Sequence, residues 1–375
     1  MATKTPAQQA LSENRMDNLT LARKEGWQRF VETPARIQPE PLTRAELESL
    51  SEEAFEDYNR QRREWHANLG PIKTPQLAEL QENIYDIVDS NAQDGDKAKG
   101  AIAIDAFPGL GKTTAVLDFA KKYHRRDIKE RGTITSEGHE RWPVCRVGLT
   151  GNTGMVEFNR AMLAFFAHPG VSRGNAAHFA HRALDCVLAC ETRLLIVDDL
   201  HFLRWRNTVG VEISNHFKYI ANEFPVTLIF VGVGLAARGL FSEGHSYEDA
   251  VIAQTGRRTT KLDLNPFVIN TEAGRREWRQ LLLALEQRIV LADKRPGMLV
   301  DDLSDYLFAR STGHIGSLMT LINRGCQRAV RSGAENLTRD LLDLVKNDAA
   351  SEKGRQELQT AFESGRLTTR LGRAG

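Results

Sequence analysis

The chain has 375 residues, of which 41% are hydrophobic and 26% are charged, so it is long and apolar enough for a packed globular core. Its formal net charge of +1 excludes a protein that coats nucleic acid by bulk positive charge alone, although it permits a local basic surface.

The sequence also excludes several cellular contexts. No apolar run approaches the roughly 20 residues of a membrane span, and the first residues lack the apolar segment of a secretory signal. The four cysteines have no regular spacing, which is typical of free thiols in a reducing compartment. We therefore expect a soluble cytoplasmic protein with no membrane partner.

The chain begins with a polar and highly charged segment. We expect residues 1–70 to form a charged N-terminal extension, either a helical arm or a partly disordered segment, and not part of a core. A helical pattern follows, in which Thr74 and Pro75 are typical of an N-cap and a first helical residue.

Apolar runs typical of strands then alternate with helical patterns. This alternation predicts an α/β domain over 71–268, with parallel strands joined by crossover helices. From about residue 270 onward only helical patterns occur, so we expect a small helical lid domain over 269–348 and a polar, basic, mobile tail over 349–375. Strands are expected at 101–105, 144–150, 194–199, 226–234 and 260–267.

The first of these strands runs into a glycine-rich loop, AIDAFPGLGKTT, which resembles the phosphate-binding pattern G-x-x-x-x-G-K-[ST] except that Ala106 replaces the first glycine. Gly109 and Gly111 let the backbone approach phosphates, Lys112 supplies a positive charge, and the Thr113 hydroxyl is a ligand for Mg²⁺. A chance turn is a weaker explanation, because a strand precedes the loop and a helix follows it. We predict an ATP site in which Ala106 is tolerated. Its remaining loop residues are Pro108, Leu110 and Thr114.

A second candidate group ends the strand expected at 194–199. Asp198 lies where a carboxylate holds Mg²⁺ through water, and Asp199 is the candidate base that orients the attacking water. Taken alone, the two acids would favour an N-cap or a surface pair after a strand. Together with Lys112 and Thr113 they favour a nucleotide site.

These pieces, in this order, resemble an AAA+ ATPase, that is, a P-loop NTPase with a parallel sheet flanked by helices and a small C-terminal helical lid. Within that superfamily the chain resembles the TniB/TnsC group of transposition regulators, which includes IstB and MuB-type proteins. The resemblance covers about residues 70–346. It rests on "PIKTPQLAEL", "AIDAFPGLGKTTAVLDFA", "LLIVDDLHFL", "VTLIFVGVGL", "QTGRRTTKLDLNPF", "STGHIGSLMTLINRGCQRAV" and "ENLTRDLL".

The resemblance implies a function and a set of partners. ATP-bound subunits would form a homo-oligomer, a ring or a filament, on double-stranded DNA and hand the target site to a transposase, and hydrolysis would drive disassembly. Arg257 and Arg258 match the place of an arginine finger that reaches a neighbouring subunit's γ-phosphate. Two exposed arginines near a helix end are the alternative for this pair.

Two departures from the superfamily pattern predict slow hydrolysis. The strand expected at 226–234 ends in FVGVG without an obvious polar sensor, and Gly316 stands where many AAA+ proteins carry a sensing arginine. Asp199 is also shorter than the glutamate that many relatives have at that place.

Candidate DNA contacts are basic residues near the second and third expected strands, and a solvated loop is the alternative for each. The basic run 121–131 is explained as well by a helix C-terminus as by nucleic acid. Two rival functions stay open: a nucleotide-gated protein-assembly switch in signalling or defence, and a helicase loader. The candidate DNA contacts are Arg146, Arg160, Arg173, Arg204 and Arg206.

Overall fold

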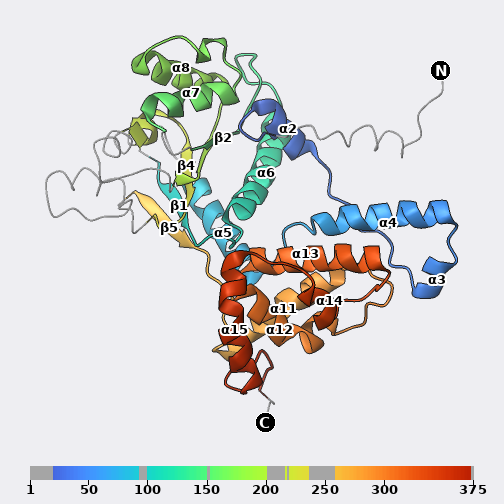
Figure 1. Cartoon of the computed structure of the whole chain (residues 1–375). Helices are drawn as coiled ribbons and strands as arrows, with labels where there is room; N and C mark the ends of the chain where they lie inside the picture. Colours follow the sequence, from blue (N-terminus) through green and yellow to red (C-terminus); the bar gives the residue numbers. More distant parts are fainter. Residues whose placement is uncertain are drawn as a thin grey trace, which may run out of the picture. The chain divides into compact units, whose positions relative to one another are not determined.

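A computed structural model describes most of the chain, which divides into two compact units (Figure 1). The sheet unit comprises Met1–Pro34, Ser90–Ala103 and Phe119–Thr260, and the helical unit comprises Ala35–Asp89, Ile104–Asp118 and Lys261–Gly375. The described residues are 20–92, 99–149, 153–200, 216–217, 219–235 and 258–372.

The strands form one five-stranded sheet in the order β2-β3-β4-β1-β5. β2 pairs with β3, and β3 with β4, in parallel, as the alternating sequence pattern predicts. Every residue of β3 and β4 is buried, which is characteristic of parallel strands covered on both faces. The bounds are β1 Ala101–Asp105, β2 Val144–Gly148, β3 Leu194–Asp198, β4 Thr227–Gly232 and β5 Thr259–Asp263.

Helices cover this sheet within its own unit. α7 packs on β2, and α8 packs on α7. The helix α6 follows β1 and contributes residues to both units. The helices named here are α2 Lys24–Glu32, α6 Lys112–Arg131, α7 Met155–Phe165 and α8 Ala176–Ala189, with a short 3-10 turn, η1, at Pro169–Val171.

The helix α2, which lies in the segment expected to be a charged extension, is instead bound to α6. Trp27 is fully buried, and its indole Nε1 donates a hydrogen bond of 3.1 Å to His124 Nδ1. Burial lowers the pKa of His124 to about 4, so the ring is neutral and accepts this bond. Arg125 donates to the Val31 carbonyl at 2.8 Å, and Lys121 donates to the Thr33 carbonyl at 2.9 Å. Part of the basic run 121–131 therefore holds α2 in place.

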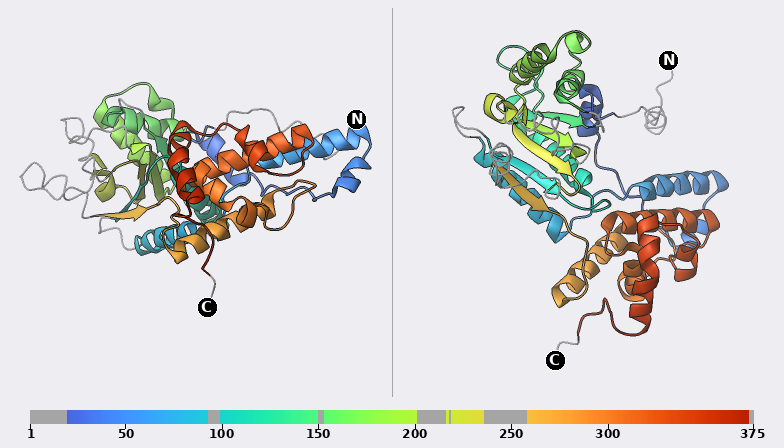
Figure 2. Two further views of the ribbon diagram at one scale, coloured as in Figure 1. Left: turned by 60° about the horizontal axis from the view of Figure 1, so that its bottom comes forward. Right: turned by 60° about the vertical axis from the view of Figure 1, so that its left-hand side comes forward.

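The helical unit is built around one apolar core, in which Trp278, Leu282 and Leu321 are fully buried or nearly so. α4 lies along α13, and α12 packs against both α13 and α15 (Figures 1 and 2). Among the described helices, none is long and apolar enough to cross a membrane. The bounds are α3 Arg44–Glu48, α4 Glu52–Ala67, α5 Pro75–Ser90, α11 Glu272–Arg288, η3 Met298–Asp302, α12 Ser304–Ser311, α13 Ile315–Ser332, α14 Arg339–Asp343 and α15 Ala349–Glu363.

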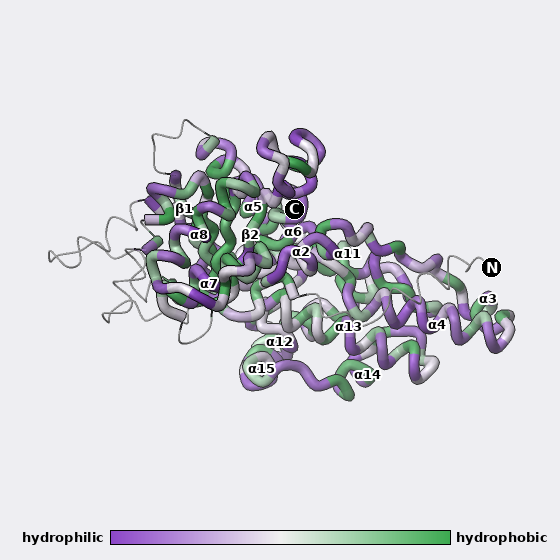
Figure 3. Tube along the Cα trace, turned by 90° about the horizontal axis from the view of Figure 1, so that it is seen from above, coloured by the Kyte–Doolittle hydropathy of each residue, from purple (hydrophilic) through white to green (hydrophobic). Residues whose placement is uncertain are grey.

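The helix α4 differs from the sequence expectation, because it packs in this core although most of its residues are hydrophilic (Figure 3). Its buried positions are polar or aromatic. Arg62 donates to Glu335 at 2.6 and 2.9 Å, with both side chains at most 2% exposed. Trp65 Nε1 donates to the Arg288 carbonyl at 2.7 Å, and His66 Nε2 accepts from the Val290 amide at 3.0 Å. A separate extension over 1–70 is therefore not observed in the described residues.

The tail also differs from the mobile segment expected over 349–375. α15 packs on α12, where Phe362 lies edge-on to Phe308 with ring centroids 6.1 Å apart. Thr369 is buried, and both its amide and its hydroxyl donate to Asp305, at 2.8 and 2.6 Å. These contacts hold the described part of the tail against the helical unit. The sequence did not predict them, because the few apolar and hydrogen-bonding residues of the tail are too far apart to form a recognisable pattern.

The buried ion pair of α4 generates a stability prediction. Glu335→Gln leaves the buried Arg62 guanidinium without its counter-charge, and we expect the free energy of unfolding to fall by roughly 3–5 kcal/mol. Urea denaturation followed by circular dichroism measures this change. The matched control is Asp293→Asn, whose partner Arg44 is exposed and bonded at 2.6 Å, and we expect little change there. Similar losses in both variants would contradict the assigned role of the buried pair.

Candidate functional site

The glycine-rich loop connects β1 directly to the first residue of α6. Gly109 and Gly111 have φ angles of +78° and +80°, in the left-handed region where a side chain is strained. A Cβ atom at Gly109 would meet nothing within 4 Å, so the backbone conformation and not crowding requires glycine there. The turn leaves the amino end of α6, with its unpaired amides and positive dipole end, immediately after the loop.

Lys112 closes this loop onto itself. Its Nζ donates to the carbonyls of Ala106 at 2.8 Å and Phe107 at 2.9 Å. Ala106 is buried, and its φ is not positive, so a methyl group is accommodated where the usual pattern has glycine. The ammonium group is therefore held at the loop by backbone carbonyls, which places a positive charge beside the amino end of α6.

The amino end of α13 touches the same loop. The Gly316 amide donates to the Gly109 carbonyl at 2.7 Å, and a Cβ atom at Gly316 would lie only 2.6 Å from that oxygen. Position 316 is the place where many AAA+ proteins carry a sensing arginine. In this chain it has no room for a side chain. In its place, a backbone amide of α13 contacts the loop.

Two acidic residues end β3 in the sheet unit. Asp198 is buried, its Oδ2 accepts a hydrogen bond of 2.6 Å from Arg146 Nη2, and its Oδ1 accepts one of 3.0 Å from the Asp199 amide. Asp199 has a φ of +61°, which is uncommon for a residue with a side chain. Such local strain is frequent at functional sites, so it favours a functional role for this strand end.

The donor types present suit a nucleotide with its metal ion. Left-handed glycines before a helix, together with a lysine, match the backbone cradle that phosphates require. The Thr113 hydroxyl and the Asp198 carboxylate are oxygen ligands of the kind that Mg²⁺ prefers. The loop follows β1, and Asp198 ends β3, and both strands belong to the same sheet with β4 between them.

The predicted arginines have different surroundings. Arg258 is exposed and donates to Asn222 Oδ1 at 2.8 Å. Arg160 donates to the Val171 carbonyl at 3.1 Å, and the Arg173 side chain is exposed with no bonding partner among the described residues. Arg146 differs from the expectation, because its side chain is only 17% exposed and contacts Asp198. Arg257, Arg204 and Arg206 lie outside the described residues.

Sequence reasoning missed the pairing of Arg146 with Asp198. The signal that contained it is the parallel register, in which Gly148 of β2 is opposite Asp198 of β3. Arg146 lies two residues before Gly148 and therefore on the same face of the sheet. The register is needed to find this contact, because the two residues are 52 positions apart.

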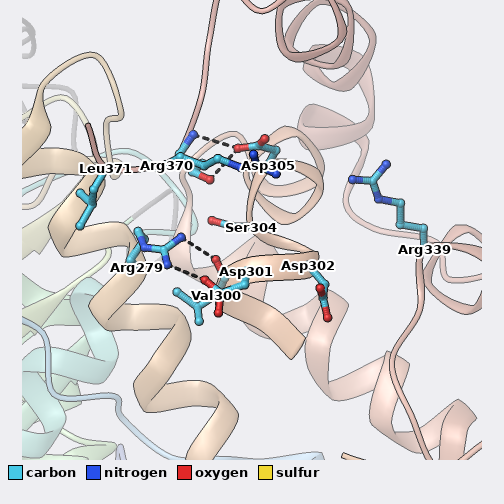
Figure 4. A pocket seen from close by; sticks show the side chains of 10 residues that line it. Arg279, Val300, Asp301, Asp302, Ser304, Asp305, Arg339, Arg370 and Leu371 are labelled. Atoms are coloured by element: carbon cyan, nitrogen blue, oxygen red, sulfur yellow. Dashed lines mark hydrogen bonds and ion pairs between the residues drawn. The ribbon is translucent and has the colours of Figure 1, made fainter. Parts of the chain in front are cut away.

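A hollow of about 400 Å³ lies elsewhere in the helical unit (Figure 4). Several of its polar groups are bonded to one another: Arg279 donates to Asp301 at 2.6 Å and to the Val300 carbonyl at 2.7 Å, and Asp305 accepts from Thr369. Residues of the glycine-rich loop do not line it. It is therefore separate from the candidate nucleotide site.

Comparisons with known proteins agree with this fold. A family model described as an AAA domain matches residues 94–241. The structure is similar to the ORC1 protein of Aeropyrum pernix in complex with DNA, with a TM-score of 0.52 and 14% identity over 81% of this chain and 71% of that chain. It is also similar to the Aeropyrum pernix ORC2 protein (ADPNP-ADP complexes), with a TM-score of 0.51 and 15% identity over 78% of this chain and 71% of that chain.

No curated protein matches the chain. These matches identify the AAA domain and its fold, and they do not distinguish the TniB/TnsC group within the superfamily. The fold itself, a parallel sheet flanked by helices with further helices toward the C-terminus, agrees with the expectation from the sequence. Residues 94–241 thus match an AAA domain, and the chain adopts the AAA+ fold, a parallel P-loop sheet flanked by helices with a helical C-terminal region.

Proposed function

We propose that this chain is an ATP-dependent DNA-binding protein that assembles on double-stranded DNA and regulates transposition. The observation that carries the nucleotide part is the left-handed backbone at Gly109 and Gly111 directly before Lys112 at the start of α6. Amides at a helix amino end attract phosphate, and a nearby ammonium group adds charge that suits the β- and γ-phosphates.

The residues assigned to metal and hydrolysis follow from the same site. Thr113 and Asp198 hold Mg²⁺, which neutralises phosphate charge when bound, and Asp199 orients the attacking water. The short side chain of Asp199 and the glycine at position 316 support slow hydrolysis. A slow ATPase of this kind acts as a switch between an assembled state and a released state.

Arg258 is assigned as the arginine finger that a subunit offers to its neighbour, with Arg257 beside it. An exposed guanidinium held by Asn222 supports this assignment, because it is presented at the surface in a defined direction. A guanidinium that reaches a γ-phosphate stabilises transition-state charge and makes hydrolysis depend on assembly.

The DNA part of the proposal rests on the sequence resemblance to transposition regulators. The similar ORC1 structure is a complex with DNA, which motivates the test. Arg160 and Arg173 are exposed candidates for phosphate contacts, and Arg204 and Arg206 are candidates from the sequence alone. We do not include Arg146 in this set, since Asp198 already binds its guanidinium. With a net charge of +1, binding depends on several subunits that add weak contacts together.

The first prediction concerns DNA binding under nucleotide control. We expect cooperative binding to plain double-stranded DNA with a non-hydrolysable ATP analogue, and weak binding with ADP or no nucleotide. Lys112→Ala removes the loop's positive charge and should abolish the nucleotide dependence. Fluorescence anisotropy of labelled DNA at fixed salt measures both. Clear ATP binding with no DNA binding in any state would overturn the DNA role and favour a protein-assembly switch or a helicase loader.

A second prediction concerns the finger. Arg258→Ala should lose nearly all ATP hydrolysis while it retains ATP binding, because a finger contributes about 10³-fold or more to the rate. Mixing it with Lys112→Ala should restore part of the hydrolysis, since each variant supplies what the other lacks. The control is Arg276→Ala, an exposed arginine on α11, which should hydrolyse ATP normally. Absence of recovery in the mixture would argue against action between subunits.

A third prediction concerns the contact between α13 and the loop. Gly316→Ala places a methyl group 2.6 Å from the Gly109 carbonyl oxygen, so helix or loop must shift, and ATP affinity should fall about tenfold or more. Gly325→Ala on the same helix is the matched control, because its methyl group meets the ends of the Leu342 and Leu337 side chains and no backbone atom of the glycine-rich loop. Titration with a fluorescent ATP analogue compares them. Equal affinities in both variants would show that this contact does not matter for binding.

A further inference from the structure

The pairing of Arg146 with Asp198 carries an inference about regulation of the proposed site. The two side chains meet because of the strand register. Gly148 lies opposite Asp198, and among the described residues no neighbouring heavy atom lies within 4 Å of the place that a Cβ atom would take at Gly148. This open space beside Asp198 lets the Arg146 side chain, from two residues earlier on the same face, reach the carboxylate.

The contact is short and poorly hydrated. Arg146 Nη2 lies 2.6 Å from Asp198 Oδ2, and the two side chains are 17% and 4% exposed. Charge-assisted hydrogen bonds of this length are among the stronger ones, and the low local dielectric strengthens them further. The negative charge of Asp198 is therefore compensated inside the protein itself.

The guanidinium is nevertheless incompletely bonded. Arg146 Nε is buried and has no hydrogen-bond acceptor among the residues that the structure describes. A buried donor without an acceptor is unfavourable, and native proteins rarely keep one without a reason. An arginine present only to neutralise Asp198 permanently would be expected to use its donors more fully. This arrangement suits a contact in which the Arg146 guanidinium can be replaced by another cation at Asp198.

We propose that Arg146 is a positioning residue that competes with Mg²⁺ for the Oδ2 side of Asp198. This inference rests on the proposed function, because Asp198 is a metal ligand only there. The water ligands of Mg²⁺ and the guanidinium would compete for the Asp198 carboxylate, so Arg146 would set the Mg²⁺ concentration at which the metal strengthens ATP binding. The site thereby discriminates ATP·Mg²⁺ from free ATP by a side-chain exchange on β2.

The test is a Mg²⁺ titration of ATP binding in the full chain. Binding of a fluorescent ATP analogue is measured in EDTA and at rising Mg²⁺ for the wild type, Arg146→Gln and Arg146→Lys. Arg146→Gln removes the competing charge and should lower the Mg²⁺ midpoint about tenfold or more. Arg146→Lys keeps a charge and should stay close to the wild type. Arg29→Gln, an exposed arginine of α2 in the same unit, is the control with an unchanged midpoint.

A second measurement uses the wild-type protein, so that the proposal can be tested even if Arg146→Gln does not fold. The NMR signal of the Arg146 Nε–H group is assigned by its absence in Arg146→Lys. It should shift when Mg²⁺ is added to the ATP-saturated wild type, and it should not shift with ATP in EDTA.

The outcomes separate the two proposals. An unchanged or higher Mg²⁺ midpoint in a folded Arg146→Gln variant overturns the inference alone. So does an Arg146 Nε–H signal that does not shift when Mg²⁺ is added while ATP is bound. If the wild type does not bind ATP at any Mg²⁺ concentration, the proposed function and the inference are both overturned.

Discussion

The left-handed backbone at Gly109 and Gly111 is the constraint on which the candidate site depends. It turns the chain from β1 into α6 and leaves the amides of α6 beside the ammonium group of Lys112. Gly316 adds a second constraint, because its amide bonds the Gly109 carbonyl where no side chain fits. Three glycines therefore position backbone groups, and in the proposed function phosphate would be recognised mainly by backbone.

The sheet and the loop were predictable because their signals are local. Apolar runs between turn residues placed the strands so well that each observed strand begins within one residue of its predicted start. Strand ends were less certain: β5 ends at Asp263, ahead of Pro266, because proline cannot donate to a ladder and the chain leaves the sheet before it. The roles of Lys112 and Asp198 follow from residue type and position, and they stay predictions until nucleotide binding is measured.

The parts that sequence reasoning missed depend on contacts between distant polar residues. α4 packs in the helical core partly through Arg62, whose partner Glu335 is 273 positions away. Because this buried position is charged and not apolar, the sequence of α4 shows no continuous apolar stripe. Arg146 and Asp198 need the β2–β3 register before their contact is visible. In both cases a charged side chain suggested a solvated surface, while a partner supplied by the fold made burial favourable.

The same reasoning limits where DNA can be bound. Lys121 and Arg125 hold α2, and Arg310 is buried with bonds to the Leu342 and Val345 carbonyls. Many basic residues that look available in the sequence are thus engaged by protein oxygen atoms, and the net charge of +1 leaves little excess. A single subunit with few unengaged cations gains little from releasing counterions along DNA. In the proposed function, an ATP-controlled assembly would gain the same small contribution many times, so nucleotide control of assembly would also be control of DNA affinity.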